Sequence, residues 1–115
     1  MYLVLIVGDE PVSKCGTPFK DAKCWPRLES WIKQLSISDY LLCNRTDEDF
    51  SDVARFHFGP IIALGTQASL ALTKLEIPFY KLPHPSGLNR LLNDKQFVDN
   101  KLKDCKHYIK HWPRE

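Results

Sequence analysis

A continuous apolar run opens the sequence: Tyr2-Leu3-Val4-Leu5-Ile6-Val7, followed by Gly8. Apolar residues occupy every position rather than alternate positions, which is typical of a strand in a parallel sheet covered by helices on both faces. The run is too short to cross a membrane and no positively charged stretch precedes it, so we expect neither a membrane span nor a secretion leader. It therefore predicts the first strand of an α/β domain.

Outward from this run, short apolar segments alternate with longer ones along the chain. Segments with the length of buried strands lie at 40–43, 61–64 and 79–82. Segments with helical spacing lie at 25–35, 47–58, 66–75 and 93–111. With right-handed crossovers, this alternation predicts a three-layer α/β/α domain built on a four-stranded parallel sheet. A length of 115 residues fits a single domain, 1–115.

The spacing also predicts which side chains of the helices face the sheet. Thr66 is positioned to cap the helix that follows the third strand. The first helix is expected to pack through Trp25, Leu28, Trp31, Ile32 and Leu35. The inner side of the second is expected to carry Phe50, Val53, Ala54 and Phe58. The last helix has an apolar stripe of Phe97, Leu102, Cys105, Tyr108 and Ile109.

Charge is distributed unevenly around a net value of +2. Residues 1–73 contain 7 Lys or Arg against 9 Asp or Glu, whereas residues 74–115 contain 9 against 5. A basic half can face a polyanion such as a nucleic acid, although a basic helix is more often simply a solvated face.

Four cysteines, Cys15, Cys24, Cys43 and Cys105, occur without any CxxC pair. This usage predicts reduced thiols in an intracellular protein. Cys105 stands near His107 and His111 in the sequence, but a tight zinc site needs about four convergent ligands. We therefore expect no metal.

Polar side chains directly follow three of the predicted strands. Asp9 and Glu10 come after the first strand, Asn44 after the second and His84 after the fourth. In a parallel sheet these strand ends meet at one edge, where ligands of such folds bind. The sequence therefore predicts one site at this edge.

The loop after the fourth strand, Pro83-His84-Pro85-Ser86-Gly87-Leu88-Asn89-Arg90, has an unusual composition. Two prolines fix the backbone on either side of His84, so its imidazole has little conformational entropy left to lose. Gly87 permits a sharp turn or a close approach to another molecule. Such a loop is suited to chemistry or to gripping a ligand.

Five segments, taken in order, resemble the motifs of the uracil-DNA glycosylase superfamily, and the resemblance covers most of the chain. They are Gly8-Asp9-Glu10-Pro11, Gly16-Thr17-Pro18-Phe19, Leu41-Leu42-Cys43-Asn44, Ile61-Ile62-Ala63-Leu64-Gly65 with Ala68, and His84-Pro85-Ser86-Gly87-Leu88-Asn89-Arg90. No single segment identifies the superfamily. The five segments in this order, ending with His84-Pro85-Ser86-Gly87-Leu88-Asn89-Arg90, are together specific to it. The resemblance implies hydrolysis of the N-glycosidic bond of uracil or a 5-substituted pyrimidine after base flipping.

The resemblance also implies catalytic roles. An acid after the first strand activates the attacking water: Glu10, directly before Pro11, matches the common branches of the superfamily, and Asp9 matches its iron-sulphur branch. Glu10 is slightly favoured. His84 matches the histidine that stabilises the departing base anion.

Binding roles follow in the same way. Phe19 matches the aromatic ring on which the extruded base stacks, and Asn44 matches the amide that reads the base edge. Leu88 would fill the vacated stack. Contacts to DNA phosphates would come from Ser86, Gly87, Asn89 and Arg90.

The chain departs from the superfamily pattern in two places. Val12 stands where the uracil-specific branch has a tyrosine that excludes 5-methyl groups, so thymine or other 5-substituted bases are not necessarily rejected. The cysteines do not follow the iron-sulphur layout, so neither a cluster nor any other cofactor is expected.

We expect a monomer that acts on single- or double-stranded DNA without a membrane association. A non-catalytic module of the same fold, binding DNA or a protein partner, is the alternative. A nucleotide-binding enzyme unrelated to DNA is less favoured, because the sequence has no Walker or dinucleotide-binding fingerprint.

Overall fold

The computed structural model of the protein describes residues 3–8, 25–83 and 93–112. Its strands are β1 (Val4–Gly8), β2 (Tyr40–Asn44), β3 (Ile61–Leu64) and β4 (Tyr80–Leu82). Its helices are α1 (Trp25–Gln34), α2 (Phe50–Phe56), α3 (Gly65–Lys74) and α4 (Lys95–His111). All four strands are parallel, in the order β2-β1-β3-β4. The predicted α/β architecture with a four-stranded parallel sheet is confirmed.

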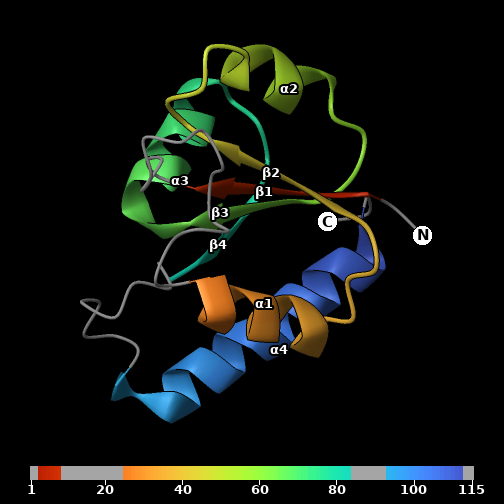
Figure 1. The fold of residues 1–115 in the computed structure, drawn as a ribbon, viewed down its shortest axis with the longest axis vertical. Coiled ribbons are helices and arrows are strands. Elements are labelled where there is room, and N and C mark those ends of the chain that lie inside the picture. Colours follow the sequence, from red (N-terminus) through yellow and green to blue (C-terminus); the bar gives the residue numbers. More distant parts are fainter. Residues whose placement is uncertain (1–2, 9–24, 84–92, 113–115) are drawn as a thin grey trace.

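Helices cover both faces of this sheet (Figure 1). Strand β1 explains why, because its side chains alternate between two hydrophobic cores. Val4 and Ile6 pack on the side of α1 and α4, while Leu5 and Val7 pack on the side of α2 and α3. Every residue of β1 is buried, as the continuous apolar run predicts.

The core beneath α1 and α4 is the larger of the two. It contains four of the predicted inner residues of α1, Leu28, Trp31, Ile32 and Leu35, together with Leu102 and Cys105 of α4. The side chain of the fifth, Trp25, lies outside the described part of the structure. Asp94 caps α4, since its side chain accepts a hydrogen bond from the backbone N–H of Phe97 at 3.0 Å. The hydroxyl of Tyr80 on β4 donates to the carbonyl of Lys101 at 3.3 Å, which ties α4 to the edge of the sheet.

The prediction for Phe58 is wrong. Helix α2 ends at Phe56 and His57 has an extended backbone, so the helical spacing no longer applies two residues later. The Phe58 side chain is 73% exposed, and its ring meets Trp112 edge to face at 5.1 Å between centroids. Phe50 and Ala54 are buried as predicted, and Val53 packs against the same core.

The prediction that Thr66 caps α3 is also wrong. The helix begins at Gly65, directly after β3, and its N-cap position is Leu64, which makes no side-chain cap. Gly65 has a positive φ of 88°, which lets the strand turn straight into the helix. Thr66 therefore lies inside the first turn.

None of the helices within the described ranges combines the length and apolar character needed to cross a membrane.

Candidate functional site

The carboxyl ends of the strands meet at one edge of the sheet. Gly8 pairs with Asn44, and Leu64 pairs with Leu82, so these four residues end their strands side by side. Arg45 extends the first pairing by donating its backbone N–H to the carbonyl of Gly8 at 2.9 Å. We call this the carboxyl edge.

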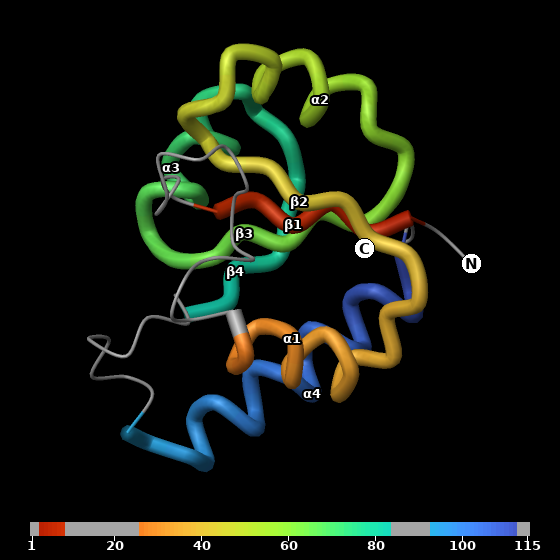
Figure 2. The backbone as a smooth tube through the Cα atoms, viewed as in Figure 1, coloured from red at the N-terminus to blue at the C-terminus, as the bar shows by residue number. Residues whose placement is uncertain are grey.

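The direction in which successive strands are added to the sheet reverses between β1 and β3. From β1 it passes through α1 to β2 on one side, and from β3 through α3 to β4 on the other (Figure 2). Ligands of doubly wound sheets bind outside the carboxyl ends at such a switch point. Gly8 and Leu64 flank this point, and Asn44 is the next strand end along the edge.

Asn44 is the predicted site residue that the described part of the chain contains. Its backbone N–H donates to Oδ2 of Asp47 at 2.8 Å, and its carbonyl accepts the backbone N–H of Asp47 at 3.0 Å. These two bonds close a tight turn directly after β2. The turn fixes the position of Asn44 at the carboxyl edge.

The Asn44 side chain is buried, and its amide nitrogen is not satisfied within the described residues. The residue is 1% exposed, and its Nδ2 group has no hydrogen-bond acceptor among the described residues. An unpaired buried donor costs about 1–3 kcal/mol, so native proteins rarely keep one without a partner. Its acceptor must come from a bound molecule or from residues outside the described ranges.

Cys43 immediately precedes Asn44 but is not suited to act as a nucleophile. Burial, followed by the charges of Asp47 and Asp49, raises the pKa of its thiol to about 12. The thiolate is the reactive form of cysteine, and it is scarce at neutral pH with such a pKa. The polar chemistry of this strand end therefore belongs to the amide of Asn44.

Sequence reasoning missed a cation at this edge. Nζ of Lys81 lies 3.4 Å from the hydroxyl oxygen of Thr66, in the first turn of α3. Both side chains are exposed. The alternation within β4 is the signal, because Tyr80 and Leu82 pack toward α4 and Lys81 must then face α3. An ammonium beside a helix N-terminus adds to the positive potential there.

The other predicted site residues lie outside the described residues. Leu82 and Pro83, which directly precede His84, are buried at the end of β4. The ends of β2 and β4 are separated by three strand spacings, or about 14 Å. A ligand held from both ends would have to span this edge. The residues outside the described ranges are Asp9, Glu10, Phe19, His84, Ser86, Gly87, Leu88, Asn89 and Arg90.

Metal ligands do not converge within the described part of the chain, where no three His, Cys, Asp or Glu side chains form a group suited to a metal ion. Cys105 is fully buried against the sheet, whereas His107 and His111 are exposed on α4 with their ring centroids 4.1 Å apart. Burial also raises the pKa of the Cys105 thiol to about 12. The three side chains therefore cannot share one ion.

No protein-family description, curated protein or solved structure was found to match this chain. The functional assignment therefore depends on the chemistry of the carboxyl edge.

Proposed function

We propose that the chain is a monofunctional DNA glycosylase of the uracil-DNA glycosylase type, acting on uracil or a 5-substituted pyrimidine extruded from DNA. The buried amide of Asn44, whose Nδ2 has no acceptor among the described residues, carries this proposal. Uracil presents a C4 carbonyl that accepts a hydrogen bond beside an N3–H that donates one. A single asparagine amide complements both, with Nδ2 donating to the carbonyl and Oδ1 accepting from N3–H.

Burial makes this complementarity selective. Cytosine carries an amino group at C4 and an unprotonated N3, so it would set donor against donor and acceptor against acceptor. Sites that hold buried polar groups reject ligands that leave those groups unpaired far more strongly than apolar pockets reject a shape change. The 1% exposure of Asn44 therefore supports discrimination by hydrogen bonding.

The remaining steps of the reaction follow from the resemblance of the loops after the first and fourth strands to those of the uracil-DNA glycosylase superfamily. Glu10 or Asp9 orients a water molecule and accepts its proton as the oxygen bonds to C1′ of the sugar. The bond from C1′ to the base nitrogen breaks, and its electron pair leaves with the base. His84 stabilises the resulting anion at a carbonyl oxygen. No cofactor takes part.

Extrusion of the base must be offset by contacts to the surrounding DNA. Leu88 fills the gap in the stack, and the loop from Ser86 to Arg90 holds phosphates. Lys81 adds a cation at the same edge, 3.4 Å from Thr66. Its charge supports binding of a polyanion along the edge that also carries Asn44.

The decisive experiment incubates the protein with single-stranded and duplex oligonucleotides that contain uracil, 5-methyluracil or 5-hydroxymethyluracil, then cleaves abasic sites with alkali. We expect strand cleavage by the unmodified protein, and loss of cleavage in Asn44→Ala and His84→Ala. Asn100→Ala is the matched control, because Asn100 is exposed on α4.

Two outcomes would overturn the proposal. One is full activity in Asn44→Ala. The other is an absence of cleavage on every substrate while DNA binding persists and weakens in Leu88→Ala or Arg90→Ala. The second result would identify a non-catalytic DNA-binding module.

A further inference from the structure

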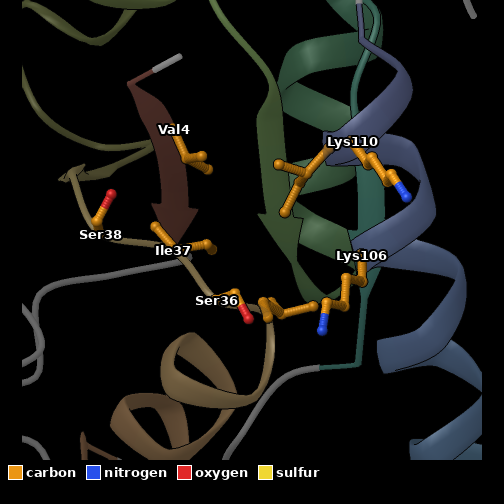
Figure 3. Close-up of a pocket in the computed structure, with 8 residues that line it drawn as sticks. Val4, Ser36, Ile37, Ser38, Lys106 and Lys110 are labelled. Carbon is orange, nitrogen blue, oxygen red and sulfur yellow. The ribbon is translucent and has the colours of Figure 1, made fainter. Parts of the chain in front are cut away.

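A cavity of about 370 Å³ lies at the opposite edge of the sheet from Asn44. Val4, the first residue of β1, forms one wall, and Ile109 near the end of α4 forms another. The connection from α1 to β2 lines it through Leu35 and Ile37, and Figure 3 shows Ile37 on this connection. The volume falls within the range of small-molecule sites in proteins.

The turn that lines the cavity has a defined and strained backbone. Ser36 donates its N–H to the carbonyl of Lys33 at 3.1 Å, and Ile37 donates to the carbonyl of Ile32 at 3.2 Å. This pair of bonds is the Schellman pattern that ends a helix, in which glycine is the usual residue at the left-handed position. Here Ser36 adopts a φ of 59°.

Polar groups gather at one side of the opening. Lys106 extends from α4 on the same side as the hydroxyl of Ser36, whereas Lys110 points away from β1 (Figure 3). Neither lysine forms an ion pair with another residue of the described ranges. The cavity therefore combines an apolar interior with a cationic, hydroxyl-bearing rim.

The apolar lining indicates the shape of the ligand. Val4, Leu35, Ile37 and Ile109 are all aliphatic, and none of the described residues that line the cavity carries an aromatic ring on which a base could stack. An aliphatic body fits this lining better than a nucleobase. A single ammonium with a neighbouring hydroxyl matches a monoanionic head, because charge-assisted hydrogen bonds to a carboxylate are the strong ones.

We propose that this cavity binds a small aliphatic carboxylate, with its chain between β1 and α4 and its head at Lys106 and Ser36. The site is separate from the carboxyl edge, so the proposal stands independently of glycosylase activity.

The test is an NMR titration of the ¹⁵N-labelled protein with octanoate, 1-octanol and octylammonium. We expect octanoate to shift the amide signals of Ser36, Ile37 and Ile109, octanol to shift them more weakly and octylammonium to leave them unchanged. No shift with octanoate, equal shifts with octylammonium, or shifts confined to Asn44 and its neighbours would overturn the proposal.

Substitutions distinguish binding of the carboxylate head group from binding of the aliphatic part of the ligand. Lys106→Ala should raise the dissociation constant for octanoate about tenfold, the loss of one charge-assisted hydrogen bond, and leave octanol binding unchanged. Lys103→Ala is the matched control, since Lys103 is exposed on α4 outside the cavity lining. Ser36→Gly relieves the backbone strain, so the protein should stay folded while octanoate binds more weakly. Unchanged octanoate affinity in both Lys106→Ala and Ser36→Gly would refute the proposal that these two residues bind the carboxylate.

Discussion

The two edges of the sheet are built from the same strands but offer opposite chemistry. The carboxyl edge buries an amide whose Nδ2 lacks an acceptor among the described residues, and it exposes Lys81 beside the start of α3. The amino edge encloses an aliphatic cavity with Lys106 at its rim.

Strand polarity accounts for this difference. In a parallel α/β domain the connecting helices begin at the carboxyl edge and end at the amino edge. Helix N-termini therefore favour anions at the first edge, and helix C-termini favour cationic side chains at the second. Lys33 in the last turn of α1 and Lys110 in the last turn of α4 follow this rule. Two ligand chemistries can thus be kept apart on one small sheet.

The largest expected effect tests the carboxyl edge. Asn44→Leu should lower kcat/KM for uracil excision at least about 100-fold, as loss of an aligned donor does in other enzymes. The melting temperature should stay level or rise, because an unpaired buried donor is removed. Thermal unfolding and the alkali-cleavage assay measure the two quantities. A large fall in melting temperature would instead mean that the amide is a structural group.

A second change breaks the amino edge alone. A methyl group added at Gly59 would collide with the backbone carbonyl oxygen of Leu3, and Gly59 has a φ of 154°. Gly59→Ala should therefore cost about 3 kcal/mol of unfolding free energy, measured by urea denaturation. Thr46→Ala, at an exposed position after β2, should change it by less than about 0.5 kcal/mol. Excision per folded molecule should be unchanged in Gly59→Ala if the edges are independent.

A third measurement compares the thiols under the two faces of the sheet. Burial raises the pKa of Cys43 and of Cys105 from 9.0 to about 12. The folded state then favours the protonated thiols, so their contribution to stability is complete below pH 9 and is lost as pH rises from 9 toward 12.

Reaction with a disulfide reagent checks this. In a Cys15→Ser/Cys24→Ser variant at pH 8, both remaining thiols should react at least about tenfold more slowly than in the urea-unfolded chain. Rapid reaction of Cys43 alone would show that the carboxyl edge opens while the core beneath α4 stays closed.

The smallest expected effect concerns DNA affinity. Lys81→Ala should weaken binding about three- to tenfold and reduce the salt dependence of the binding constant by about one phosphate contact. Lys74→Ala is the matched control, because Lys74 is exposed at the opposite end of α3. Filter binding at several salt concentrations measures both. Equal losses of DNA affinity in the two variants would show that a lysine contributes by its charge alone, whether or not it lies at the carboxyl edge.

The sequence was sufficient where local patterns decide structure. The unbroken run of β1 predicted burial on both faces, and the strand end predicted a position for Asn44 at the carboxyl edge. Phe58 was mispredicted because α2 ends at Phe56, so helical spacing no longer decides where the Phe58 side chain lies. Lys81 was missed although the alternation within β4 indicates the face that it takes. The cavity was missed because it arises from packing between elements that are distant in sequence. Local periodicity carries no information about such contacts.

The turn that joins Asn44 to Asp47 has a further consequence, for kinetics. Its hydrogen bonds connect residues only three positions apart, so the backbone of Asn44 is held in place before any ligand arrives. Binding then requires little ordering of this strand end, and the entropy of the free and bound states should differ little there. Correct and incorrect bases would reach the amide at similar rates and differ in how long they stay.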